Sequence, residues 1–218
     1  MRALAPTFSK LLGQPIVVEN RPGAGTRIGT DQIVRAPKDG YTLGVMVSAS
    51  GVNLPALDPA LRYHPVRDFT HLTIAFEAFF VIVAQPSLGV KRIGEFLELA
   101  RAQPGKLNYS SSGTGSSSHI WVEVFQAATG TRFTHVPYKG EGAALQDVIG
   151  GQIQFAFASS LAKPHVDSGK LVALAATSPQ RLSVFPDVPT AREAGLGDFT
   201  AGGWIGFVGP AGLPPAVA

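Results

Sequence analysis

Residues 107–151, LNYSSSGTGSSSHIWVEVFQAATGTRFTHVPYKGEGAALQDVIGG, contain the pattern that decides the fold of this chain. Twice in this stretch a β-like run ends in a small polar loop with glycine, and an apolar helical pattern follows each loop. The first N–H groups of a helix have no partner within the helix, and the helix dipole places partial positive charge there. Because glycine and serine add further donors without bulk, the stretch predicts two neighbouring sites for carboxylate or phosphate groups.

The composition excludes several classes of protein. The 218 residues are 45% hydrophobic, which suffices for one large domain or two small ones. The balance of 18 Lys and Arg against 15 Asp and Glu gives a net charge of +3, without a basic run that would predict nucleic-acid binding. Cysteine is absent, which excludes disulfides and thiolate chemistry without fixing the compartment. No apolar run approaches the roughly 20 residues of a membrane helix, and residues 1–13 lack the layout of a signal peptide.

Short apolar runs alternate with helical patterns along the chain. The predicted strands are Ile16–Glu19, Thr42–Val47, Phe80–Ala84, Leu107–Ser110, Phe133–Pro137, Ile153–Ala158, Leu171–Thr177 and Ile205–Val208. The predicted helices are Leu4–Leu12, Arg27–Arg35, Ile93–Ala102, His119–Thr129, Ala143–Ile149 and Thr190–Ala194. Strands that are apolar on both faces and alternate with helices indicate mostly parallel sheets covered on both sides, so we expect an α/β fold.

No flexible linker divides the chain, so two lobes would be joined by ordered strands. Phe80–Pro86 and Trp204–Pro210 are the predicted crossing points, because each is an apolar run that ends in proline. We therefore expect residues 1–85 and 205–218 to form the first lobe and residues 86–204 to form the second.

The two ends of the sequence predict an incomplete first lobe. Residues 1–13 have a helical pattern with no strand before it, and the last ten residues, GPAGLPPAVA, end where Pro214 and Pro215 would normally open a helix.

The sequence contains no complete motif for a nucleotide cofactor, a serine hydrolase or a zinc site. The loop with Gly113 and Gly115 imitates a dinucleotide-binding motif, but Ser118 stands where its third glycine belongs, and no P-loop lysine follows. No Gly-x-Ser-x-Gly elbow of a serine hydrolase occurs. The five histidines lack the paired spacing of a zinc site. We expect neither a cofactor nor a metal.

Two features near the loops allow alternative interpretations. His119 and Glu123 lie four residues apart, so they could form a helix-surface contact or, with a loop serine, the catalytic set of an α/β enzyme that acts on a small acidic metabolite. The enzyme hypothesis needs a third group to orient the base, and none is obvious. Lys139 could contact an anion or carry a solvated charge, and Tyr138 is expected as a wall residue of the site.

Serine is concentrated in one short segment. Six serines lie among residues 110–118. One serine can cap the helix that follows, so the others have hydroxyl groups to spare for a ligand.

Six segments give the chain a family resemblance. They are residues 18–25 (VENRPGAG), 36–43 (APKDGYTL), 108–113 (NYSSSG), 136–140 (VPYKG), 169–175 (GKLVALA) and 185–190 (FPDVPT). In order and spacing they resemble the substrate-binding proteins of tripartite tricarboxylate transporters, also called the Bug family. The resemblance covers nearly the whole chain.

The resemblance implies a periplasmic solute receptor rather than an enzyme. Its two α/β lobes, in the type II periplasmic-binding-protein arrangement, would close on a small organic acid and present it to the membrane components of a transporter. The residues that would then line the ligand site are Ser111, Ser112, Gly113, Gly115, Ser116 and Ser117 in the second lobe, Ser48, Ser50 and Asn53 in the first lobe, Ser159 and Ser160 on the hinge side, and Tyr138 in the wall.

The chain also departs from the family pattern. Family members begin with a strand and a Pro/Gly-rich loop that form part of the ligand wall, and their terminal segment returns to the first lobe. We therefore expect a monomer whose incomplete first-lobe sheet could associate through a free strand edge. A transcriptional effector-binding domain shares the two-lobed architecture, but it would call for an attached DNA-binding helix pair that this sequence lacks.

Overall fold

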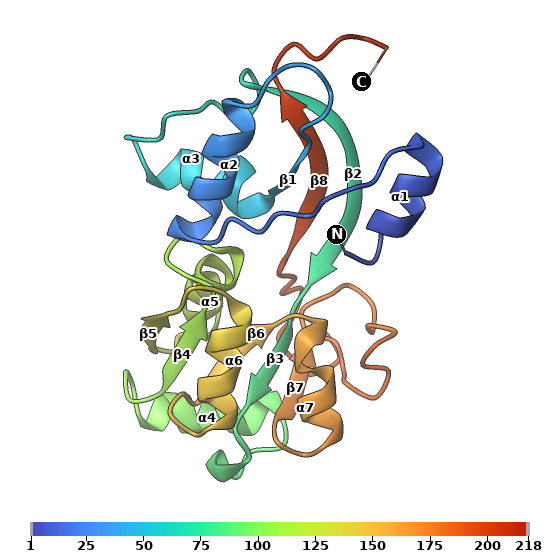
Figure 1. Cartoon of the computed structure of the whole chain (residues 1–218). Helices are drawn as coiled ribbons and strands as arrows, with labels where there is room; N and C mark the ends of the chain where they lie inside the picture. Colours follow the sequence, from blue (N-terminus) through green and yellow to red (C-terminus); the bar gives the residue numbers. More distant parts are fainter. Residues whose placement is uncertain (1, 217–218) are drawn as a thin grey trace.

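The computed structural model describes residues 2–216, which form two lobes stacked end to end (Figure 1). The helices are α1 (Ala5–Leu12), α2 (Arg27–Val34), α3 (Leu54–Leu57), α4 (Ile93–Ala102), α5 (Ser117–Thr129), α6 (Glu141–Ile149) and α7 (Lys163–Asp167), with short turns η1 (Ala24–Thr26), η2 (Ala49–Asn53), η3 (Pro86–Leu88) and η4 (Ser160–Ala162). The strands are β1 (Gly44–Val47), β2 (Phe69–Phe79), β3 (Val81–Ala84), β4 (Asn108–Ser111), β5 (Thr134–Pro137), β6 (Phe155–Ala158), β7 (Val172–Ala176) and β8 (Gly202–Pro210).

The second lobe has a five-stranded sheet with the order β5-β4-β6-β3-β7. Strand β4 is parallel to β5 and β6, whereas β3 is antiparallel to β6 and β7. Every side chain of β3 is buried, as expected for a strand covered on both faces. Phe96 of α4 and Phe125 of α5 pack on one face, and Leu145 and Val148 of α6 belong to the core on the other. The predicted α/β fold with helices on both sides of the sheet is confirmed.

The first lobe has a three-stranded sheet with the order β1-β8-β2, and both of its strand pairs are antiparallel. This sheet differs from the mostly parallel sheet expected for each lobe. The reason is that β8, which returns from the second lobe, lies between β1 and β2 and runs opposite to both. Its core is small and includes Ile33, Met46, Tyr63, Phe69 and Val208.

Two ordered strands connect the lobes. Strand β2 continues through Phe80 into β3, and the chain returns through Ala201 into β8 (Figure 1). Because β3 belongs to the second sheet and β8 belongs to the first sheet from Gly202 onward, we propose lobe boundaries near Phe80 and Ala201, in place of the predicted steps at 85/86 and 204/205.

Two predicted elements do not form, and one strand was not predicted. The run Ile16–Glu19 is extended but pairs with no strand among residues 2–216, and Val17 is 82% exposed. Thr190–Ala194 forms turns, although the Thr190 hydroxyl and the Glu193 carboxylate exchange the hydrogen bonds of a helix-capping box. The long strand β2 was not predicted, because two register shifts interrupt the alternation of its side chains. Within residues 2–216, no helix is long and apolar enough to span a membrane.

Candidate ligand-binding site

The loops with the predicted binding residues gather at one edge of the five-stranded sheet. Strands β4, β5 and β6 are mutually parallel, so their carboxyl ends meet at the same edge. Residues 112–116, 138–140 and 159–160 follow these three strands. Helix α5, which opens from the first of these loops, contacts η2 and β8 of the first lobe. This edge of the second lobe therefore faces the first lobe (Figure 1).

Hydrogen bonds within the loop after β4 use several of its serines. The Ser111 hydroxyl accepts a 3.2 Å bond from Gly113 N and lies 2.6 Å from His135 Nε2. Ser116 caps α5 by accepting from His119 N at 3.3 Å. The Ser118 hydroxyl accepts from Ser112 N at 3.1 Å. The hydroxyls of Ser111, Ser116 and Ser118 therefore hold the shape of the loop.

Other donors of this loop remain free. In the described part of the chain, the N–H groups of Ser117 and Ser118 in the first turn of α5 have no acceptor. The hydroxyls of Ser112 and Ser117 are half-buried and likewise without a partner among residues 2–216. Since the N-terminus of a helix also carries partial positive charge, this group of donors suits an anion.

Ser48 of the first lobe contacts strand β8 near the start of α5. Its Oγ atom accepts a 2.8 Å bond from Trp204 N. A Cβ atom on Gly203 would lie 2.5 Å from Ser48 Oγ and 3.8 Å from Ser117 Oγ. Hydroxyls from both lobes therefore converge on the backbone of Gly203, which has no side chain to fill the space between them.

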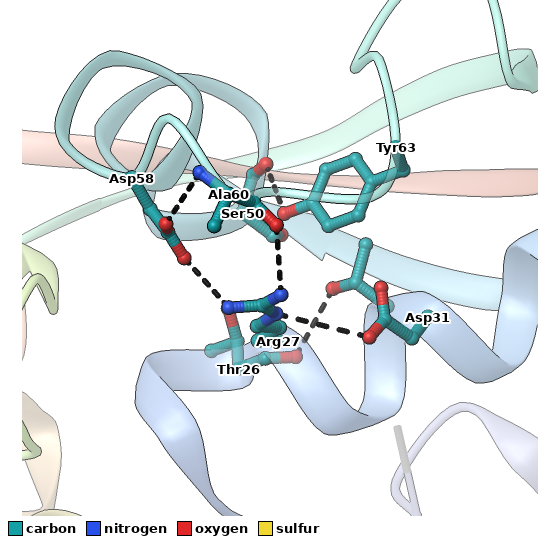
Figure 2. Close-up of polar contacts among 8 residues, drawn as sticks. Thr26, Arg27, Asp31, Ser50, Asp58, Ala60 and Tyr63 are labelled. Carbon is teal, nitrogen blue, oxygen red and sulfur yellow. Dashed lines mark hydrogen bonds and ion pairs between the residues drawn. The ribbon is translucent and has the colours of Figure 1, made fainter.

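Ser50 and Asn53 have different roles in the first lobe. Ser50 is fully buried, its hydroxyl bonds the backbone of Val47, and its carbonyl accepts a 2.7 Å bond from the Tyr63 hydroxyl (Figure 2). The Ser50 hydroxyl therefore bonds within its own lobe. Asn53 Nδ2 donates a 3.3 Å bond to Gly115 O, so this side chain connects the two lobes directly.

A loop that the sequence reasoning did not assign to the site also meets the second lobe. Gly23, Ala24, Gly25 and Thr26 all have positive φ, which is unusual for alanine and for β-branched threonine. A Cβ atom on Gly25 would lie 2.8 Å from Thr114 O. The Arg-Pro-Gly-Ala-Gly motif that carried the family resemblance was the available signal, since two nearby glycines predict a tight loop.

Arg27, which follows this loop, is held by its own lobe. Its guanidinium bonds Asp58 at 2.6 Å and donates to Ala60 O at 3.1 Å, as Figure 2 shows. Asp58 in turn accepts from Ala60 N at 2.9 Å. This cation is therefore paired with a carboxylate of its own lobe, whereas Lys139, in the loop after β5, is exposed and has no ion pair among residues 2–216.

The remaining predicted residues, Tyr138, Ser159 and Ser160, lie just beyond β5 and β6. The Tyr138 hydroxyl donates to Asp147 at 2.5 Å, and burial raises the pKa of Tyr138 to about 12, so this hydroxyl bonds within the second lobe. Ser159 N donates to Glu141 Oε1 at 2.6 Å, and Ser160 is exposed. Burial raises the pKa of the Glu141 carboxyl, a group that the sequence reasoning did not single out.

A catalytic arrangement of His119, Glu123 and a loop serine does not form. Glu123 accepts a 2.5 Å bond from the Tyr109 hydroxyl, and His119 Nδ1 accepts from Gly115 N at 3.2 Å. The close pair is Ser111 and His135, but burial and neighbouring His119 lower the pKa of His135 to about 4, which makes it a weak base at neutral pH. Among residues 2–216, no carboxylate hydrogen-bonds His135 to orient it.

One hollow of about 670 Å³ lies between the lobes. Its lining comes from Leu54, Leu57 and Asp58 of the first lobe and Thr114, Gly115, His119, Ile120 and Glu123 of the second. Gly115 is the predicted site residue in this lining. The hollow thus borders the serine loop on its α5 side.

Comparison with known proteins gives a consistent result. The family model described as "Tripartite tricarboxylate transporter family receptor" matches residues 1–218. Protein BugT of Bordetella pertussis is 36% identical over 220 residues, covering 99% of this chain and 67% of that protein. A protein encoded in the gbd 5′ region of Cupriavidus necator is 33% identical, covering 99% of this chain and 65% of its own length. The chain thus spans about two thirds of the length of these curated relatives.

Solved structures with the same fold include proteins bound to organic acids. One described as a periplasmic transporter has a TM-score of 0.94 and 39% identity, covering 99% of this chain and 73% of that one. MatC from Rhodopseudomonas palustris with bound malate has a TM-score of 0.91 and 34% identity, with coverage of 99% and 74%. R. palustris Rpa4515 with adipate has a TM-score of 0.95 and 28% identity, with coverage of 99% and 73%.

Proposed function

We propose that this chain, which belongs to the tripartite tricarboxylate transporter receptor family, binds a small organic acid between its lobes in the periplasm and delivers it to a membrane transporter. The matching family model describes a receptor, and two structural neighbours, MatC and Rpa4515, have bound malate and adipate. We propose binding without chemistry, so no residue of the chain is assigned a catalytic role.

The observation that carries this proposal is the group of free donors at the start of α5. The N–H groups of Ser117 and Ser118 and the hydroxyls of Ser112 and Ser117 have no partner within residues 2–216, and they lie at the edge that faces the first lobe. A carboxylate can accept several such bonds at once, and charge-assisted bonds are stronger than neutral ones. We therefore assign one carboxylate of the ligand to this group.

We divide the predicted site residues by what their polar groups already bond. Ser48, Ser112 and Ser117 would contact the ligand, since Ser112 and Ser117 have free hydroxyls and Ser48 lies across Gly203 from Ser117. The residues that would shape the site are Ser50, Asn53, Ser111, Gly113, Gly115, Ser116 and Tyr138. Ser159 and Ser160 would border it from the hinge side.

The two-lobed architecture gives the binding mechanism. A ligand that touches loops of both lobes stabilises the arrangement in which these loops approach each other. Closure removes water from the donors, and their hydrogen bonds then act in a medium of lower dielectric constant. Neutral donors suffice because the helix dipole contributes the positive potential.

A thermal-shift screen tests the proposal. A ligand that binds only the folded chain raises the unfolding midpoint increasingly as its concentration rises. We expect dicarboxylates such as malate or adipate to raise the midpoint with concentration, and an uncharged diester of the same acid to have no effect. If no organic acid in a broad panel raises the midpoint or gives heat in calorimetry, the proposed function is wrong.

A further inference from the structure

Two histidines from different elements stack beside the serine loop. The rings of His119 on α5 and His135 on β5 have centroids 4.1 Å apart. The ring of Tyr109 on β4 stacks 4.8 Å from that of His135 and lies 6.5 Å from that of His119. Tyr109 is fully buried, and both histidines are half-buried. The three rings therefore come from the strand before the loop that joins β4 to α5, from the helix after it and from the neighbouring strand β5.

Each histidine holds one end of that loop. His135 Nε2 lies 2.6 Å from the hydroxyl of Ser111, the last residue of β4. His119 Nδ1 accepts a 3.2 Å bond from Gly115 N, one residue before the cap of α5. The two rings thus support both sides of the turn that places the hydroxyl of Ser112.

His119 is also linked to the first lobe through Gly115. Gly115 donates its N–H to His119 and accepts a 3.3 Å bond from Asn53 Nδ2 through its carbonyl oxygen. A change at His119 therefore acts on both the shape of the serine loop and a contact between the lobes.

The bond from Gly115 fixes the protonation state of His119. Nδ1 can accept a hydrogen bond only when it carries no proton, and a protonated ring is a donor at both nitrogens. Protonation of His119 would therefore place two donors, Nδ1–H and Gly115 N–H, against each other. Because the two rings stack at 4.1 Å, protonation of one ring makes protonation of the other less favourable.

Several neighbouring groups influence the protonation of His119 and His135. Burial lowers the pKa of both His119 and His135, while the nearby Glu123 carboxylate acts in the opposite direction. Glu123 is hydrogen-bonded to the Tyr109 hydroxyl. From the first lobe, Asp58 lines the same hollow as His119, but Asp58 is paired with Arg27.

We propose that the stacked pair His119–His135 is a proton-sensitive positioning element that holds residues 111–115 in their binding conformation, so that acidification weakens the binding of the organic acid. The part of this inference that concerns affinity rests on the proposed function. The part that concerns the loop stands independently of any ligand.

The loop is tested first, in the unliganded chain. In a pH titration followed by ¹H–¹⁵N NMR, we expect the Gly115 amide signal to move together with the ring signals of His119. The variant His119→Gln keeps a side-chain acceptor but does not titrate, so its Gly115 signal should stay constant through the same range. A wild-type Gly115 signal that does not respond while His119 titrates would overturn the proposal.

Ligand binding is then measured by calorimetry with malate and adipate at about pH 7.5 and about pH 5. We expect the affinity of the wild-type chain to fall about tenfold more than that of His119→Gln over this range. The ring of His165 on α7 is half-buried and has no hydrogen-bond partner among residues 2–216, so His165→Gln serves as the matched control and should behave as wild type. Because all variants meet the same ligand, protonation of the acid itself cancels in the comparison.

The two proposals fail in different ways. If the wild-type chain binds neither acid at either pH, the proposed function or its ligand class is contradicted, and the NMR titration still decides the role of the histidines. If the wild type and His119→Gln lose affinity equally, the positioning role of the pair is wrong although the chain is a receptor.

Discussion

The hydroxyl of Thr177 donates a 2.5 Å hydrogen bond to the carbonyl oxygen of Ala201, where the chain leaves the second lobe. The same hydroxyl oxygen accepts a 2.9 Å bond from Phe80 N, where the chain enters that lobe. Backbone bonds join the same residues, since Thr177 N donates to Phe80 O and Ala201 N donates to Thr177 O. One buried threonine therefore hydrogen-bonds both chain segments that connect the lobes.

Replacement of Thr177 by valine should destabilise the chain. The side chain is fully buried, so Phe80 N–H and Ala201 C=O would each lose a partner that water cannot replace. We expect the free energy of unfolding to fall by about 1–3 kcal/mol in urea denaturation. The same change at exposed Thr73 in β2 is the control and should have little effect. Equal midpoints for Thr177→Val and Thr73→Val would show that the hinge does not depend on this hydroxyl.

Gly203→Ala should disturb the point where the lobes meet. The added Cβ would come within 2.5 Å of Ser48 Oγ, which is bonded to Trp204 N and cannot move away without losing that bond. We expect a loss of about 1–3 kcal/mol in unfolding free energy. A second change, Ser48→Gly, removes the obstructing hydroxyl, so the double variant should be more stable than the sum of the single effects predicts. Additive effects in this double-mutant cycle would contradict the contact.

The stability of the chain should fall as the pH decreases from about 6.5 to about 4. Burial holds the pKa of His135 at about 4 in the folded chain, below its ordinary value of 6.5, so the unfolded chain binds this proton first. With solvent screening of this half-buried ring taken into account, the resulting loss is about 1–3 kcal/mol, and it is complete below the folded pKa. His135→Gln should flatten this part of the stability profile, measured by urea denaturation at a series of pH values. A variant profile as steep as that of the wild type would contradict this prediction.

Glu141 should contribute to the pH profile with the opposite sign. Burial raises the pKa of its carboxyl in the folded chain, so the ionised form is disfavoured at neutral pH and the folded chain gains stability from this group as the pH falls. Glu141→Gln keeps an acceptor for Ser159 N and carries no charge. We therefore expect this variant to have a higher free energy of unfolding than the wild type at pH 7, with the difference decreasing toward acid pH. A variant that is less stable at pH 7 would show that the charge itself is needed.

The sequence predicted the second lobe better than the first. Patterns around residues 107–151 gave β4, α5, β5 and α6 within a few residues, because each strand there is short, ends in a polar loop with glycine and is followed by a helix with clear periodicity. Strand β2 escaped prediction because it is bulged and exposed on much of its length, so pairing with β8 rather than its own pattern determines its structure. The run Ile16–Glu19 shows the converse, since a suitable pattern without a neighbouring strand does not form a sheet.

The candidate site was predictable in outline and not in its internal contacts. A cluster of serines and glycines before a helix indicates donors for an anion, and these donors lie at the carboxyl edge of the sheet. Which hydroxyls remain free depends on long-range partners, such as His135 for Ser111 and Tyr63 for the carbonyl of Ser50. Such partners come from distant segments, so local patterns do not reveal them.

A bulky residue in place of Ser112 should abolish ligand binding and leave the fold intact. The Ser112 hydroxyl is half-buried without a hydrogen-bond partner among residues 2–216, so Ser112→Trp can fill the space of the ligand without breaking a bond of the loop. Ser183→Trp places the same side chain at an exposed serine outside the loops and serves as the control. We expect calorimetry with malate and adipate to show at least about a hundredfold loss of affinity for Ser112→Trp, equivalent to about 3 kcal/mol, and none for Ser183→Trp. The two variants should have the same circular dichroism spectrum. Unchanged affinity of Ser112→Trp would place the ligand elsewhere on the chain.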